Sequence, residues 1–195
     1  MSGISDSFQR PINYLRISVT DRCNLRCVYC MPAGGISLLP HSEILTYEEI
    51  SMVVHAAAGM GISKIRISGG EPLVRAGLVK LVDMLSRIEG IDDISLTTNG
   101  ILLKEYAGAL KEAGLRRVNV SLDSLSSEGF ARISRSDKLN QVIAGIEEAR
   151  KVNLEPVKVN MVVMRGFNDN ELLDFALLNK EGWHIRFIEL MPFIN

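Results

Sequence analysis

The chain has 195 residues, of which 47% are hydrophobic and 23% are charged, and its net charge is −1. This composition is that of an ordinary globular protein, and the length favours one domain over residues 1–195. The near-neutral charge argues against a polyanion-binding surface, so we expect neither a nucleic-acid nor a membrane partner. The N-terminal segment MSGISDSFQRPINYLR has no cationic and then apolar signal pattern, which favours a cytoplasmic location.

Strand-like runs alternate with amphipathic helical runs roughly every 25 to 35 residues. The expected strands cover residues 14–20, 64–69, 94–99, 117–123, 157–164 and 185–191. The expected helices cover residues 47–60, 76–88, 103–113, 139–151 and 169–180, and Thr46 and Glu49 provide a capping box for the first.

Strict alternation of strands and helices predicts an α/β fold with parallel strands and right-handed crossovers. Six such units predict an incomplete (βα)6 barrel of the TIM type, with a doubly wound open sheet as the competing fold. The sequence stops just after the sixth expected strand, at MPFIN, where a covering helix should follow. We therefore expect the chain to be part of a longer protein.

Polar residues occupy alternate positions of the expected strands, and Leu, Ile, Val or Met lies between them. If the helices cover the outside of the barrel, the polar set must face the lumen. Buried polar groups without partners are costly, so a wet lumen or a polar ligand has to satisfy them. Three of these residues are cations and favour a negatively charged ligand such as a phosphate: Arg16, Arg66 and Lys158. An antiparallel sheet with one solvated face is the alternative.

All three cysteines lie within residues 20–32, TDRCNLRCVYCMP, with the spacing C-x3-C-x2-C. Soft thiolates select zinc or an iron–sulfur cluster, but structural zinc needs four ligands and the chain offers no fourth cysteine or suitably spaced histidines. A redox disulfide between Cys27 and Cys30 would leave Cys23 idle. A [4Fe–4S] cluster on Cys23, Cys27 and Cys30 would leave one iron open to a substrate or cofactor. We favour the cluster, with zinc and purely structural cysteines as alternatives.

The cysteine motif, with Tyr29 before its last cysteine, resembles that of the radical S-adenosylmethionine (SAM) enzymes. GGEP, residues 69–72, looks like the SAM-amino-group motif of that superfamily. Within the superfamily the chain is similar to the GTP 3′,8-cyclase family of molybdenum cofactor biosynthesis from about Arg10 onward. The segments that carry this similarity are NYLRISVTDRCNLRCVYCMP, KIRISGGEPLVR, LTTNG, NVSLDSL, KLNQVIAGI, VKVNMVVMRGFNDNEL and RFIELMPF.

The resemblance implies a position-by-position assignment of the site. A [4Fe–4S] cluster would be bound by Cys23, Cys27 and Cys30. SAM, chelating the open iron, would be contacted by Tyr29, Gly70, Ser121 and Met191. The substrate GTP would be contacted by Arg16, Arg66, Thr97 and Lys158, which include the three lumen cations inferred from strand alternation. The simpler interpretation is that Thr97 and Ser121 are strand-end polar residues and that Met191 packs in the core.

The resemblance also implies the reaction. Reductive cleavage of SAM gives a 5′-deoxyadenosyl radical, which removes a ribose hydrogen from GTP, and the ribose carbon then bonds to C8 of the purine. The product is (8S)-3′,8-cyclo-7,8-dihydroguanosine 5′-triphosphate. The reaction requires an electron donor. The protein could act as a homodimer, and the sequence does not decide its oligomeric state.

The family has a C-terminal segment with a second three-cysteine cluster that holds the guanine, and these 195 residues contain no such cysteines. We therefore expect them to assemble the first cluster and bind SAM without completing the GTP reaction. The alternatives are another radical SAM enzyme or a non-catalytic iron–sulfur or zinc module.

Overall fold

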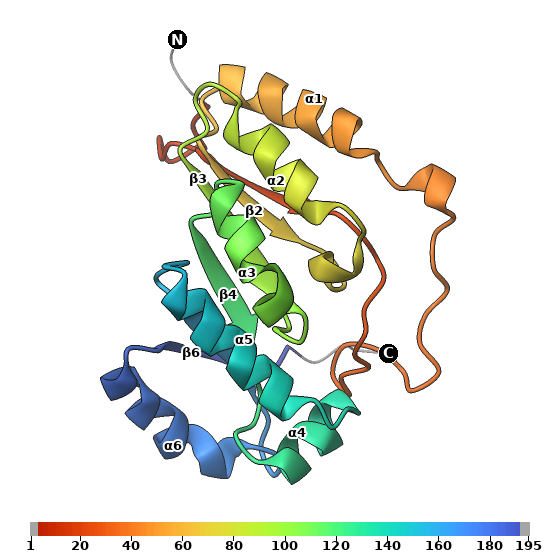
Figure 1. Ribbon diagram of the computed structural model, residues 1–195, viewed down its shortest axis with the longest axis vertical. Helices are drawn as coiled ribbons and strands as arrows, with labels where there is room; N and C mark the ends of the chain where they lie inside the picture. The colour runs from red at the N-terminus through yellow and green to blue at the C-terminus, as the bar shows by residue number, and fades with distance from the viewer. Residues whose placement is uncertain (1–3, 192–195) are drawn as a thin grey trace.

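The computed structural model describes residues 4–191. Six strands form a single sheet in the order β1-β2-β3-β4-β5-β6, and every neighbouring pair is parallel (Figure 1). This sequential order confirms the incomplete (βα)6 arrangement. It excludes the doubly wound sheet, whose strand order reverses, and the antiparallel alternative. The strands are β1 (Tyr14–Ser18), β2 (Lys64–Ser68), β3 (Asp93–Thr98), β4 (Arg117–Ser121), β5 (Lys158–Val163) and β6 (His184–Glu189).

The five expected helices are present, although the last is broken. The α-helices are α1 (Tyr47–Gly59), α2 (Leu78–Ser86), α3 (Leu103–Glu112), α4 (Ser127–Ser134), α5 (Leu139–Lys151) and α6 (Leu172–Leu177). The 3-10 helices are η1 (His41–Glu43), η2 (Pro72–Val74), η3 (Asp169–Glu171) and η4 (Leu178–Glu181).

Two helical features differ from expectation. The helix expected over 169–180 is divided into η3, α6 and η4, because Glu171 turns inward and accepts hydrogen bonds from Ser124 Oγ and Leu125 N. Helix α4 was not expected, since it has only 8 residues and two buried apolar side chains, Phe130 and Ile133. Its start depends on the Ser126 side chain, which accepts a hydrogen bond from Gly129 N. No helix of residues 4–191 is long and apolar enough to cross a bilayer.

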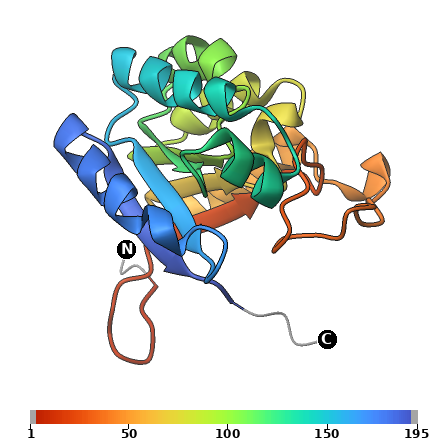
Figure 2. The same cartoon turned by 90° about the horizontal axis from the view of Figure 1, so that it is seen from below.

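The helices form a layer against one face of the sheet, and no helix of the described chain lies on the opposite face (Figure 2). Strand residues that point toward the helices are completely buried, and they include Ile65, Ile67, Leu96, Val118 and Val159. They join the helix residues in one hydrophobic core cluster. The expected division of the sheet into an apolar outer face and a polar inner face is therefore present.

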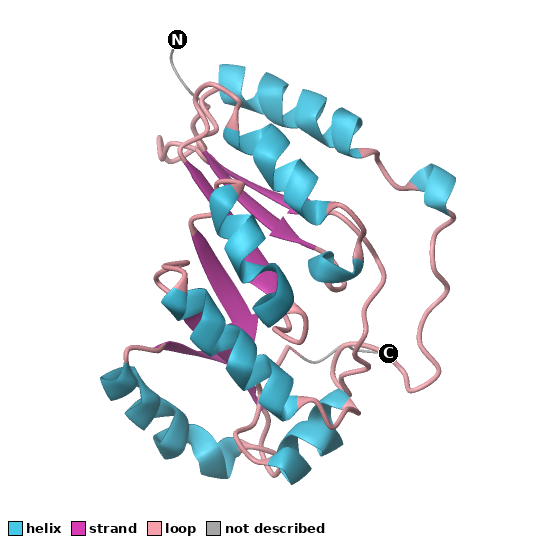
Figure 3. Cartoon of the chain, viewed as in Figure 1, coloured by secondary structure: helices cyan, strands magenta, loops and turns pink. Residues whose placement is uncertain are grey.

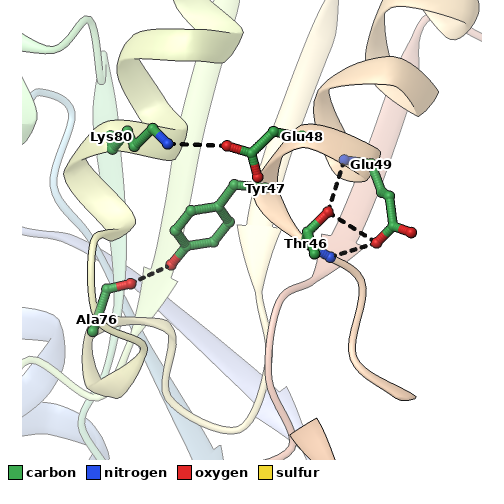
Figure 4. Close-up of polar contacts among 6 residues, drawn as sticks. All are labelled: Thr46, Tyr47, Glu48, Glu49, Ala76 and Lys80. Atoms are coloured by element: carbon green, nitrogen blue, oxygen red, sulfur yellow. Dashed lines mark hydrogen bonds and ion pairs between the residues drawn. The ribbon is translucent and has the colours of Figure 1, made fainter. Parts of the chain in front are cut away.

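Helix α1 begins with the expected capping box (Figure 4). Thr46 Oγ1 accepts a hydrogen bond from Glu49 N at 3.2 Å, and the Glu49 carboxylate accepts one from Thr46 N at 2.7 Å. The same turn is tied to the α2 region, because Tyr47 donates its hydroxyl to Ala76 O and Glu48 pairs with Lys80 at 3.0 Å. Figure 3 shows that this helix follows a long connection from β1 that is almost entirely loop.

Candidate functional site

A cavity at the carboxyl ends of the strands gathers most of the predicted site residues. Its lining includes Arg16, Cys23, Cys27, Tyr29, Cys30, Gly70, Thr97 and Ser121. These come from β1, the loop after it, the turn after β2, and the ends of β3 and β4. Parallel strands end on the same side of a sheet, so residues distant in sequence converge there. Arg66 and Lys158 lie outside this lining, and Met191, beyond β6, is 79% exposed and packs in no core.

The three cysteines are free thiols, so the alternative of a Cys27–Cys30 disulfide is not formed. Within residues 4–191, no three His, Cys, Asp or Glu side chains gather closely enough to ligate a single metal ion. In a cubane each cysteine binds a different iron, so thiols spaced around one cavity fit the cluster.

Burial affects the two inner thiols. It raises the pKa of Cys27 to about 12, and Asp123 and the other cysteines contribute in the same direction. Burial also raises the pKa of Cys23. Thiols in this environment are protonated at neutral pH, and a ligated cation is needed to hold them as thiolates.

The cysteine loop, residues 20–32, is fixed to the turn after β2 by backbone hydrogen bonds. Gly70 N donates to Thr20 O at 2.7 Å, and Glu71 N donates to Arg22 O at 2.8 Å. The carboxylate of Glu71 is 1% exposed and accepts hydrogen bonds from Leu73 N, Thr98 Oγ1 and Asn99 N. GGEP therefore joins the cysteine loop to the end of β3.

Tyr29 is held by a buried carboxylate at the end of β4. Its hydroxyl donates to Asp123 Oδ2 at 2.8 Å, and Val162 N donates to Asp123 Oδ1 at 2.8 Å. Burial raises the pKa of Asp123, while these two hydrogen bonds act in the opposite direction. Burial also raises the pKa of Tyr29, so the phenol remains a neutral donor. This pair fixes the aromatic residue between the last two cysteines.

A row of cations crosses the inner face of the sheet. The strand register places Arg16 beside Arg66, Asn119 beside Lys158, and Asn160 beside Arg186. Arg117 pairs with Asp93 at 2.5 Å. Desolvation lowers the pKa of Lys158, and the neighbouring cations Arg186, Arg117 and Arg66 contribute in the same direction.

Several polar atoms on this face are buried without a partner among the described residues: Arg66 Nε, Asn119 Oδ1 and Asn160 Oδ1. A ligand that is negatively charged and also able to donate hydrogen bonds would satisfy the cations and the amide oxygens together. The geometry thus supports a polar anion on the inner face, next to the cysteine cavity.

The sequence assignment gave no function to Glu71, Asn99, Asp123, Arg117 or Arg186. Arg117 lies two residues before Asn119 on β4, and Arg186 lies beside Asn160 in the register of β5 and β6. Extending the strand alternation by one step would therefore have placed both arginines on the inner face. The buried hydrogen bonds of Glu71 and Asp123 join segments far apart in the chain, and no local pattern indicates them.

Comparison with known proteins identifies related sequences. The family profile described as the Radical SAM superfamily matches residues 17–178. A GTP 3′,8-cyclase of Thermodesulfovibrio yellowstonii is 57% identical over 191 residues, covering 97% of this chain and 59% of the relative. A GTP 3′,8-cyclase of Desulforamulus reducens is 59% identical over 188 residues, covering 96% of this chain and 58% of the relative. The chain thus spans less than two thirds of the length of these curated relatives.

Solved structures share the fold at low identity. Methylornithine synthase (PylB) matches with a TM-score of 0.73 at 17% identity, over 92% of this chain and 53% of that protein. The protein anSMEcpe with bound AdoMet matches with a TM-score of 0.73 at 21% identity, over 91% of this chain and 49% of that protein. At these identities the likeness is one of fold.

Proposed function

Since this chain belongs to the radical SAM superfamily, we propose that Cys23, Cys27 and Cys30 hold a [4Fe–4S] cluster beside a SAM site. We further propose that the activity in which these residues take part is the cyclisation of GTP to (8S)-3′,8-cyclo-7,8-dihydroguanosine 5′-triphosphate, for molybdenum cofactor biosynthesis. The observation that carries the proposal is the convergence of the three thiols with Tyr29 and Gly70 in one cavity at the carboxyl ends of the strands.

When bound, the reduced cluster supplies the electron that cleaves SAM to methionine and the 5′-deoxyadenosyl radical. The chain's own residues supply position and charge. Gly70 would offer its backbone and Ser121 its hydroxyl to SAM, and Tyr29, fixed by Asp123, would close one wall of the site. Met191 is a proposed SAM contact at the end of the segment after β6.

GTP is proposed for the inner face because its triphosphate matches the cation row. Arg16, Arg66 and Lys158 would hold the phosphates, and Thr97 would contact the nucleoside. Such anchoring would orient the ribose toward the SAM site, an effect of position rather than of acid–base chemistry. The names of the curated relatives agree with this substrate. We also propose a cytoplasmic location and an external one-electron donor, since free thiols and a reducible cluster both require reducing conditions.

The proposal is tested by anaerobic reconstitution of the 195-residue chain with iron and sulfide. We expect about four irons per chain, and release of 5′-deoxyadenosine on reduction with SAM. The variant in which all three cysteines are replaced by alanine is the control and should show neither property. One zinc per chain, or a cluster that does not cleave SAM, would contradict the proposal. We also expect no cyclised nucleotide from this polypeptide alone, because its three cysteines are all used by one cluster.

A further inference from the structure

We propose that Asn99 sets the reduction potential of the cluster through an N–H···S hydrogen bond to Cys23. This inference rests on the proposed function, since it concerns the cluster that Cys23 would bind. Asn99 follows the last residue of β3, lines the same cavity as the three cysteines, and is 9% exposed. It is a positioning and tuning residue that acts on the cluster through a ligand.

The three cysteine sulfurs are in unequal environments. Cys23 Sγ accepts a hydrogen bond from Leu25 N at 3.4 Å, and the side-chain amide of Asn99 lies 3.9 Å from the same atom. Among residues 4–191, no hydrogen bond from another residue reaches the sulfur of Cys27 or Cys30, and Cys27 has only a contact with its own backbone N–H. One corner of the cluster would therefore be hydrogen-bonded by the protein.

The amide of Asn99 can be oriented in only one way. Its Oδ1 accepts a hydrogen bond from Ile101 N at 3.1 Å, and a backbone N–H can only donate. The Nδ2 group is therefore on the other side, where it donates to Asn24 Oδ1 at 2.7 Å and directs its second N–H toward Cys23. The backbone is held as well, because Asn99 N donates to the buried Glu71 carboxylate at 2.6 Å.

A hydrogen bond to a cluster sulfur stabilises the reduced state more than the oxidised state, because the reduced cluster carries one more negative charge. The effect is larger where water is largely excluded, as it is around this buried amide. Loss of the donor should therefore move the potential to a more negative value and make the cluster harder to reduce.

The test is an anaerobic redox titration of the iron-loaded chain with titanium(III) citrate, followed by electron paramagnetic resonance without SAM. Asn99→Asp keeps the size and shape of the side chain and removes both N–H donors. We expect its equilibrium constant for reduction to fall by about tenfold, which corresponds to about 59 mV for one electron. Asn24→Asp is the matched control, since it adds the same charge nearby but keeps the acceptor that orients the Asn99 amide. We expect a clearly smaller shift than in Asn99→Asp, since the added carboxylate disfavours the reduced cluster in both variants but only Asn99→Asp also loses the N–H donor.

A wild-type potential for iron-loaded Asn99→Asp, or an equal shift in Asn24→Asp, would overturn this inference and leave the proposed function intact. Failure of the wild-type chain to take up iron would instead overturn the proposed function. If the Asn99→Asp variant does not take up iron, the same redox titration of the Asn99→Ser variant tests the inference. Serine is uncharged and too short to reach the sulfur, so an unshifted potential there would also overturn the inference.

Discussion

Gly70 is the residue at which the turn after β2 approaches the cysteine loop most closely. A Cβ atom built there would lie 2.4 Å from Arg22 O and 2.9 Å from Asp21 O, and both are backbone atoms that cannot rotate away. Glycine at this position is therefore required by the approach of two backbones. The residue next to it, Glu71, then carries the hydrogen bonds that connect the loop to β3.

We expect Gly70→Ala to displace the cysteine loop and to cost about 1–3 kcal/mol of unfolding free energy, as overpacking does. Cluster loading should fall with it, measured as iron per chain after reconstitution. Gly108→Ala is the control, because no atom lies within 4 Å of its added Cβ and it sits inside α3. Gly108→Ala should raise the unfolding free energy by about 0.5–1 kcal/mol, because alanine favours the helix interior over glycine. Full iron loading of Gly70→Ala would show that the close approach is not needed.

At the scale of elements, the cysteine loop is held by the C-terminal end of α4, the helix absent from the sequence-based prediction. Arg26 N and Val28 N donate to the carbonyl oxygens of Ser134 and Ile133. In return, Arg135 Nη1 donates to the carbonyl oxygens of Arg26 and Met31. The last carbonyls of a helix lack partners inside the helix, so they are free to bind this loop.

Removal of the Arg135 guanidinium should loosen the loop without unfolding the sheet. For Arg135→Ala we expect a loss of about 1 kcal/mol in local opening free energy, and amide hydrogen exchange of residues 24–31 about fivefold faster. Arg132→Ala is the matched control on the same helix, because Arg132 Nη2 donates to the carbonyl oxygens of Gly166 and Phe167 instead. Its faster exchange should appear around residues 165–168. Unchanged amide exchange of residues 24–31 in Arg135→Ala would show that Arg135 does not hold the cysteine loop in place.

At the scale of the whole molecule, the parallel register aligns polar residues from different strands into one inner face. Arg66 lies beside Arg16 on one side and Ser95 on the other. Its guanidinium also lies over the Tyr14 ring, with Cζ 5.3 Å from the ring centroid. This inner face is the side of the incomplete barrel that carries no helices, since the helices cover the other side of the sheet (Figure 2).

For the cluster-loaded chain we expect Arg66→Ala to weaken GTP binding by about tenfold, because a charge-assisted contact to phosphate is lost. Isothermal titration calorimetry measures this directly. Arg87→Ala is the control, since that residue pairs with Asp83 on the exposed side of α2 and leaves the inner face unchanged. Equal GTP affinity in wild type and Arg66→Ala would remove the substrate assignment while leaving the cluster proposal standing.

The fold was predictable because its signals are local. Each expected strand lies within a few residues of the observed one, and the alternation of Ile65 and Ile67 with Arg66 already defined the two faces. The errors fall where the chain leaves the sheet. Thr20 and Asp123 were assigned to strands by polarity, whereas they lie in the loops that build the site. Helix α4 was missed because its 8 residues offer few apolar positions, so its place in the fold depends on contacts distant in sequence, such as those with the cysteine loop.

The sequence by itself determined the chemistry available to this protein: three thiols without a fourth, glycines before a glutamate, and cations at alternate strand positions. Those features are set by residue type and short spacing, which the backbone periodicity converts directly into placement. Only the tertiary structure decided which groups act together, such as Tyr29 with Asp123 and Asn99 with Cys23. Such pairs are separated by tens of residues along the chain, and they meet only because parallel strands end at a common edge.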